Sequence, residues 1–215
     1  MVKKLSVMVV ILFTLMSITY GISNFLKNQI PAKIIGKAKL ILKPLGVLKN
    51  EKEKDIYGFE ILIDLRGVKT VRKDNGNSSP TVLGGYTVGI SFDNKNIQFL
   101  GVKGGNTKEF RKPPFHTNNK KANENGLVKF SAVHTNQNSP TGLISVAIAK
   151  FKVKNKNSLK SIKLYGDSLA TSMKFFPNRK ILGPISIPFE GEKIKRKKLK
   201  NNPKTLEKGK KIKVK

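Results

Sequence analysis

The sequence predicts an all-β domain folded as a single two-layered β-sandwich. Two stretches show the clearest strand pattern. From Phe59 to Leu65 and from Tyr86 to Phe92, apolar residues alternate with polar or small ones, as in strands with one buried face. Connections rich in Gly, Pro and Asn separate several such stretches, and helical periodicity is weak outside the N-terminal segment. Short strands with turns of this composition and without helices are what a two-sheet sandwich requires.

The stretch Leu83 to Phe110 is interpreted as a hairpin around which the domain is organised. Asp93-Asn94 has turn chemistry because short Asx side chains hydrogen-bond their own backbone, and Ile97 to Val102 is the expected return strand. Phe92 is expected to close the core beside the turn. The side chains expected to be largely buried are Tyr86, Val88, Ile90, Phe92, Phe130, Ile148 and Phe151.

Further strands follow from the same alternation. The segment from Gly142 to Lys154 is nearly all apolar and then alternates, which predicts a central strand whose far end reaches solvent. Two polar stretches, Lys73 to Pro80 and Arg111 to Asn125, are expected to be loops, the first within an insertion that starts at Lys69. The other predicted strands are Ala38–Leu42 (stopped by Pro44), one opening at Gly126, Ser161–Tyr165 and Ile185–Phe189, and Met173–Phe176 is left as a strand or one turn.

The N-terminal segment, residues 1–21, resembles a secretory signal. Lys3 and Lys4 form a positive start, and Leu5 to Met16 is apolar apart from one Ser and one Thr. An uncleaved membrane anchor is the alternative, although the apolar run is short for a span of roughly 20 residues. We therefore expect a secreted or envelope protein with no stable transmembrane span after processing and no nucleic-acid partner in vivo.

Composition and charge divide the remaining chain into three segments. Residues 22–36 are expected to be a spacer or a loosely packed first strand, residues 37–190 the sandwich, and residues 191–215 a basic disordered tail. From Glu190 to Lys215 there are 12 basic and 3 acidic residues, a net charge of 12 − 3 = +9, with few apolar residues to bury. The tail residues expected to bind polyanions are Lys195, Arg196, Lys197, Lys198, Lys200, Lys210 and Lys211.

Composition also limits the chemistry. The formal net charge of +30 favours polyanionic neighbours, although a lysine-rich composition can also serve solubility alone. The absence of Cys excludes disulfides, thiolate metal sites and a cysteine nucleophile.

No residue pattern predicts catalysis or a metal site. Asp64 and Asp93 fall in a strand and a turn, where solvent-facing or turn-capping roles are ordinary, and no pair of carboxylates has a catalytic context. His116 and His134 lie in polar loops without a third ligand at metal spacing. Gly104-Gly105 lacks the strand-loop-helix context of a phosphate loop and is assigned to a turn. We therefore expect neither an enzyme nor a cofactor.

The order of several short motifs resembles the cohesin module, the receptor domain of cellulosome scaffolds. The matching motifs are Gly85-Tyr86 leading into Ile90-Ser91-Phe92-Asp93, Phe99-Leu100-Gly101-Val102 with Gly104-Gly105, Asn125-Gly126-Leu127-Val128-Lys129-Phe130, and Thr141-Gly142-Leu143 running to Phe151-Lys152-Val153. The resemblance covers roughly residues 37–190. It implies a jelly-roll sandwich of about nine strands and a non-catalytic module that docks a dockerin-like partner, a small calcium-loaded helical module, on one sheet face. The insertion at 69–80 and the basic tail depart from the family pattern.

Two alternative functions remain. A carbohydrate-binding module needs a row of exposed aromatics, and this chain has no Trp, which leaves Tyr57 and Tyr165 as possible sugar-stacking residues. A basic surface can instead attach the protein to an anionic envelope or matrix polymer. Sugar binding would survive high salt and polymer attachment would not, while dockerin binding would require calcium.

Overall fold

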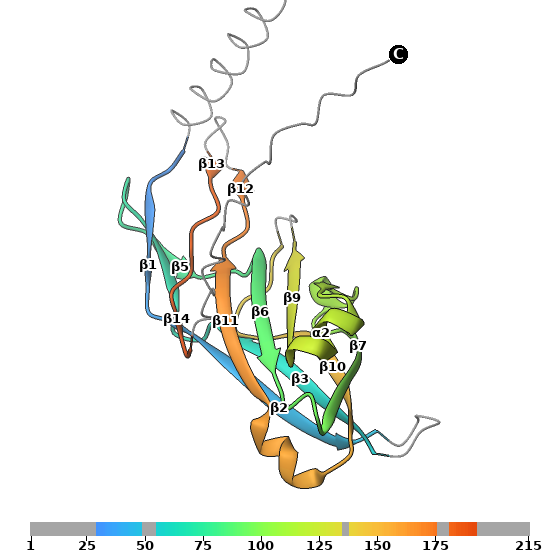
Figure 1. Ribbon diagram of the computed structural model, residues 1–215. Coiled ribbons are helices and arrows are strands. Elements are labelled where there is room, and N and C mark those ends of the chain that lie inside the picture. The colour runs from blue at the N-terminus through green and yellow to red at the C-terminus, as the bar shows by residue number, and fades with distance from the viewer. Residues whose placement is uncertain (1–28, 49–54, 135–137, 176–180, 193–215) are drawn as a thin grey trace, which may run out of the picture.

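Two β-sheets packed face to face form the body of the protein, as the computed structural model shows (Figure 1). The structure describes residues 29–48, 55–134, 138–175 and 181–192, so the predicted signal segment and the basic tail beyond 192 lie outside the described residues. The five-stranded sheet comprises, in spatial order, β14 (Phe189–Glu190), β2 (Ala38–Val47), β3 (Ile56–Asp64), β10 (Leu143–Val153) and β7 (Ile97–Gly104). The four-stranded sheet comprises β11 (Lys163–Ala170), β6 (Gly85–Ser91), β9 (Leu127–Val133) and β8 (Phe115–His116). The all-β sandwich predicted from sequence is confirmed.

The core lies between the two sheets and is rich in phenylalanine. Phe99 of β7 lies with its ring centroid 5.9 Å from that of Phe130 in β9 and 5.5 Å from that of Phe151 in β10. The Tyr86 hydroxyl of β6 donates to the Val146 carbonyl of β10 at 3.1 Å, which links the sheets through a satisfied buried polar group. All seven side chains expected to be buried are buried.

The predicted hairpin between Tyr86 and Val102 is wrong. β6 pairs with β9 and β11 in the four-stranded sheet, whereas β7 pairs with β10 in the five-stranded sheet. The turn at Asp93 therefore carries the chain from one sheet to the other. Alternation in the sequence determines which face of a strand is buried, but it does not specify the neighbouring strand.

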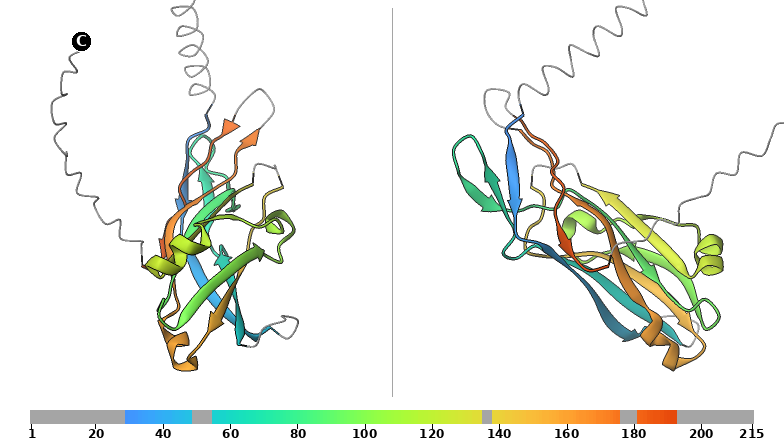
Figure 2. Two further views of the ribbon diagram at one scale, coloured as in Figure 1. Left: turned by 45° about the vertical axis from the view of Figure 1, so that its right-hand side comes forward. Right: turned by 60° about the vertical axis from the view of Figure 1, so that its left-hand side comes forward.

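Two small sheets add strands beyond the nine of the sandwich. β1 (Ala32–Ile35) pairs with β4 (Lys69–Arg72), which pairs with β5 (Ser78–Pro80), and β12 (Lys174–Phe175) pairs with β13 (Ile181–Leu182). The described chain thus has more strands than the nine predicted. The insertion is a β4–β5 hairpin rather than a loop, and it extends from one end of the sandwich beside β1 (Figure 2).

A short helix closes one open side of the sandwich. α2 (Asn119–Asn125) begins after Asn118, whose side chain accepts from the Lys120 amide, and ends at the left-handed Gly126 with φ +62°. Asn123 accepts from the Phe99 amide and donates to its carbonyl, so its carboxamide pairs with the free edge of β7 as a strand would. The sequence pattern predicted only a loop here. The helix is two turns long, and such a length gives little periodicity to detect.

The other side is closed by the C-terminal segment. Phe189 of β14 pairs in parallel with Ala38 of β2, while the Ile187 amide donates to Leu169 of β11, so this segment joins both sheets. A Cβ at Gly166 of β11 would lie 2.1 Å from the Phe189 ring, so glycine at this position lets the ring pack directly against the β11 backbone.

β2 is longer than predicted because Pro44 does not end it. β14 pairs only with Ala38 and Lys39, so the later half of β2 is an edge, where proline is tolerated. A register shift follows between Pro44 and Gly46, and Gly46 has φ +75°.

Candidate functional site

The outer face of the four-stranded sheet is the candidate site, and its residues follow from the pairing register. Because Tyr86, Val88 and Ile90 of β6 point into the core, Thr87 and Ser91 point outward. The register sets Thr87 beside Ser131 of β9 and Ser168 of β11. The outward residues, here named the docking face, are Thr87, Ser91, Phe115, Leu127, Lys129, Ser131, Val133, Lys163, Tyr165 and Ser168.

Most polar side chains in the middle of the docking face are already paired with each other. The Thr87 and Ser131 hydroxyl oxygens lie 3.0 Å apart, and the Ser91 hydroxyl donates to the Tyr165 hydroxyl at 3.4 Å. Lys129 Nζ lies 3.8 Å from Asp167 Oδ2, which joins β9 to β11. A partner covering this surface leaves few polar groups without a hydrogen-bonding partner, which keeps the desolvation cost of docking low.

Two large apolar side chains project from one edge of the docking face. Phe115 of β8 is 86% exposed and Val133 of β9 is 79% exposed. β8 pairs Phe115 with Ser131 and His116 with Phe130, so Phe115 takes the outward side while the His116 ring lies 5.6 Å from the Phe99 ring. Exposed apolar side chains gathered on one strand pair are typical of a protein-binding surface.

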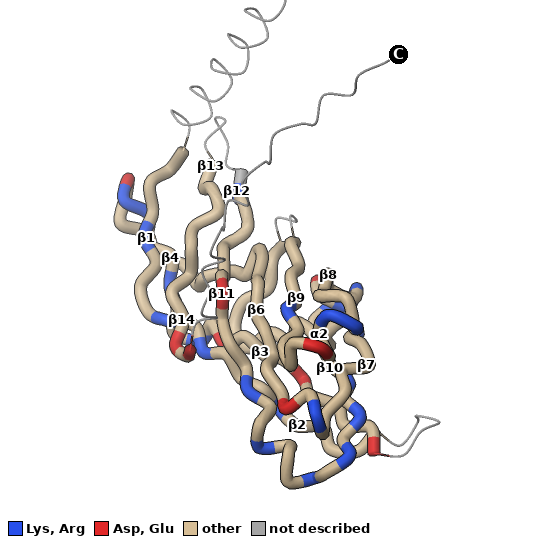
Figure 3. Tube along the Cα trace, in the orientation of Figure 1, with Lys and Arg blue, Asp and Glu red and all other residues tan. Residues whose placement is uncertain are grey.

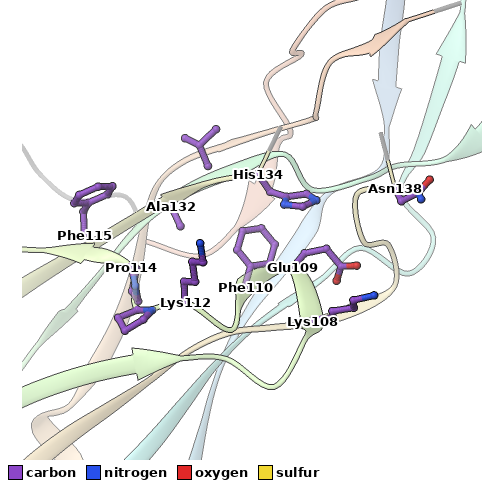
Figure 4. Close-up of a pocket in the computed structure, with 11 residues that line it drawn as sticks. Lys108, Glu109, Phe110, Lys112, Pro114, Phe115, Ala132, His134 and Asn138 are labelled. Atoms are coloured by element: carbon purple, nitrogen blue, oxygen red, sulfur yellow. The ribbon is translucent and has the colours of Figure 1, made fainter. Parts of the chain in front are cut away.

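A cavity of about 630 Å³ adjoins this edge. Phe110 and His134 form its middle, with ring centroids 6.0 Å apart, and Phe115 lies on the other side of it from Asn138 (Figure 4). Lys108 and Lys112 also line it, and His134 Nε2 is buried without a hydrogen-bond partner within the described residues. The cavity therefore extends the apolar edge of the docking face with a polar recess.

The outer face of the five-stranded sheet differs because its centre is covered. Glu60 of β3 is 5% exposed, and its Oε1 accepts from Asn106 Nδ2 at 2.6 Å and from Ser145 Oγ at 2.7 Å. Lys43 Nζ lies 3.8 Å from Oε2. Leu62 and Ile148, on the same outward side, are also buried. This face offers no comparable apolar surface at its centre within the described part of the chain.

The residues proposed to stack on sugars are not brought together. Tyr57 of β3 points into the core and is 9% exposed, so it presents no open ring to a ligand. Tyr165 is half-buried on the docking face, where its hydroxyl is bonded to Ser91. The tail residues from Lys195 to Lys211 lie outside the described residues.

The two aspartates singled out from sequence are structural. The Arg66 guanidinium beside Asp64 bonds both of its carboxyl oxygens, at 2.9 and 2.7 Å, and holds the pKa of that carboxyl below its usual value. Asp93 accepts from the Asn96 side chain at 2.7 Å and the Lys95 amide at 3.1 Å, which likewise lowers its pKa. The turn-capping interpretation of Asp93 is confirmed.

The described residues include no cluster of three or more His, Asp or Glu side chains that could hold a metal ion.

Gly104 and Gly105 serve close packing, because added Cβ atoms would lie 1.9 Å from the Arg111 carbonyl oxygen and 2.1 Å from that of Ser145. Within the described part of the chain, no helix is long and apolar enough to cross a membrane.

Sequence reasoning missed Phe115 and Val133. A signal existed for Val133, because extending the alternation of Val128 and Phe130 assigns it to the outward side with Lys129 and Ser131. Phe115 carried no such signal, because its strand has two residues and follows Pro113-Pro114.

Comparison with known proteins finds similarity only among solved structures. No protein-family model matches the chain, and no curated protein matches it. The seventh ScaB type I cohesin from Pseudobacteroides cellulosolvens is 14% identical, with a TM-score of 0.38 over 72% of this chain and 94% of that one. CaCohA2 from Clostridium acetobutylicum is 15% identical, with a TM-score of 0.35 over 71% and 91%. A type II cohesin–X-dockerin complex from Acetivibrio cellulolyticus contains a chain that is 15% identical, with a TM-score of 0.34 over 74% and 90%.

Proposed function

We propose that this chain is an exported, non-catalytic module that binds a partner protein on the docking face of its four-stranded sheet. The observation that carries the proposal is the pair of exposed apolar side chains, Phe115 and Val133, at the edge of a surface whose central Thr87 and Ser131 are small and bonded to each other. The small residues at the centre of this surface let a partner approach the sheet closely, and two apolar anchors beside a cavity supply area to bury.

The partner proposed is a small helical module of dockerin type. This choice rests on the cohesin-like sequence motifs. One motif ends at Asp93, a second contains Gly126 to Phe130, and a third ends at Val153. Any calcium would belong to the partner. Export rests on the signal-like segment 1–21, and retention at an anionic envelope by the basic tail is a further proposal for residues outside the structure.

The test is capture of secreted proteins of the source organism on the immobilised full chain. Phe115→Asp combined with Val133→Asp should abolish capture of a protein that the unsubstituted chain retains, because each change places a charge where apolar area must be buried. The matched control is Leu45→Asp combined with Val47→Asp, two exposed apolar residues of β2, which should leave capture intact.

Adding a chelator distinguishes the class of partner. Release of the captured protein by EDTA is expected of a calcium-loaded module. If the Phe115/Val133 variant still captured the protein and the Leu45/Val47 variant did not, binding would lie on the other sheet. That outcome would contradict the proposal.

A further inference from the structure

Two connections at one end of the sandwich carry five exposed lysines. Lys95 lies in the turn between β6 and β7, whereas the other four lie in or beside the 3₁₀ helix η2 (Lys156–Ser161) between β10 and β11. Figure 3 shows Lys and Arg positions gathered at this lower end of the view. The five residues, here named the lysine-rich end, are Lys95, Lys154, Lys156, Lys160 and Lys163.

The two connections are fastened to each other. The Lys154 amide donates to the Asn96 carbonyl at 2.9 Å, and the Asp93 amide donates to Ser161 Oγ at 3.0 Å. Ser161 Oγ in turn donates to the Ser158 carbonyl at 2.7 Å. These bonds hold the lysine backbones in a fixed arrangement, so that a ligand would not bear the cost of ordering two loops.

The connections are also anchored to the core. Phe92 and Ile97 flank the first connection, and Val153 and Ile162 flank the second, and all four side chains are buried. The backbone that carries these lysines is therefore held by packing against the core.

Among the described residues, little negative charge balances these lysines. Residues 93–96 and 154–163 contain five lysines and one acid, a net charge of 5 − 1 = +4. The acid is Asp93, whose carboxylate accepts from the Lys95 amide and the Asn96 side chain. Asp55 lies nearby, its carbonyl accepting from the Val153 amide. None of the five lysines forms an ion pair within the described part of the chain.

We propose that the lysine-rich end is a binding surface for a linear polyanion with repeating phosphate, sulfate or carboxylate groups. Unpaired like charges held together repel each other, and a polyanion relieves that repulsion while releasing its own condensed counterions. The surface is made of residues other than those of the basic tail. It meets the docking face only at Lys163, which pairs with Ser91 at the opposite end of β6 from the Gly85–Val133 pair, so a polymer bound there leaves Phe115 and Val133 free.

The test compares two variants of equal net charge in the full chain. In the first, all five residues of the lysine-rich end are replaced by Gln. In the second, five exposed lysines elsewhere are replaced by Gln, namely Lys37, Lys69, Lys73, Lys120 and Lys121. The tail is present in both, so it contributes equally. Unchanged melting temperatures establish that both variants fold.

Binding is measured as a function of salt with long-chain inorganic polyphosphate, heparin and polygalacturonate as probes, which distinguishes phosphate, sulfate and carboxylate. The slope of log K against log salt is negative, and its magnitude should fall by about 0.7–0.9 for each anionic group that a variant no longer neutralises. If all five lysines contact the polymer, the first variant should therefore lose roughly 3.5–4.5 from the slope with at least one probe, and the second far less. An equal loss in both variants would show that net charge alone acts, and no loss in either would exclude the surface. Binding only to phosphatidylglycerol vesicles would identify a membrane surface and overturn the proposal.

Discussion

The two outer faces of this sandwich are built from the same alternating strands and yet present opposite surfaces. On the five-stranded sheet, the outward Glu60 is buried and receives hydrogen bonds from Asn106 and Ser145. On the four-stranded sheet, the outward Phe115 and Val133 are almost fully exposed. One face buries a charge and the other exposes apolar area, which is the reverse of the usual distribution.

The contrast arises from what crosses each face. The segment after β7 places Asn106 over the five-stranded sheet, whereas Phe115 and Val133 of the four-stranded sheet are exposed among the described residues. A buried carboxyl group that accepts two hydrogen bonds fixes structure, and an exposed apolar pair is available to a partner. Stability should therefore depend on one face and binding on the other.

The largest expected effect is on the free energy of unfolding. It distinguishes inward-facing from outward-facing side chains of the four-stranded sheet. Phe130→Ala should lower the free energy of unfolding by about 3–5 kcal/mol, because the side chain is fully buried and packs against the Phe99 ring. Phe115→Ala, the same substitution on the adjacent strand, should change it by less than about 0.5 kcal/mol. Denaturant titration measures both, and similar costs would show that Phe115 is not exposed.

The next effect tests whether Glu60 is structural. Glu60→Ala leaves Asn106 Nδ2 and Ser145 Oγ without their acceptor and should cost about 1.5–3 kcal/mol in the same titration. Glu60→Gln retains an acceptor oxygen and should cost clearly less. If the Ala variant is as stable as the unsubstituted protein, the carboxylate is solvated and the contrast between the faces fails.

The smallest effect concerns acid stability at Asp64. Arg66 lowers the pKa of this carboxyl in the folded chain, so its contribution to stability is complete above the unfolded pKa of about 3.9 and is lost as pH falls through the lower folded value. Asp64→Asn should therefore reduce the melting temperature slightly at neutral pH and flatten its fall below about pH 4. A parallel pH profile for the two proteins would show that the pair adds nothing to stability.

The buried faces could be predicted from sequence, and the pairing of strands could not. Side-chain alternation identified the inward residues of β6, β9 and β10 because one face of each strand must be apolar. It did not reveal that β6 and β7 belong to different sheets, because that depends on long-range pairing with β9, β11 and β10. The hairpin β4–β5 was missed because its strands are short and polar.

The docking face was predictable only in part. The small outward residues Thr87, Ser91 and Ser131 follow from alternation. The exposure of Phe115 depends on a two-residue strand whose register is fixed by pairing with β9. Composition favoured a surface role for Tyr57, and the register turns it into the core instead.

The partner is expected to cover the four-stranded sheet, and one measurement tests this directly. Because the chain contains no cysteine, a single introduced thiol can carry an environment-sensitive dye at one chosen position. Ser131→Cys places the dye on the docking face and Lys43→Cys places it on the outer side of the five-stranded sheet. On addition of the captured partner, the account predicts a blue shift and an emission increase for the dye at position 131 and an unchanged spectrum at position 43. A response at position 43 with none at position 131 would contradict it.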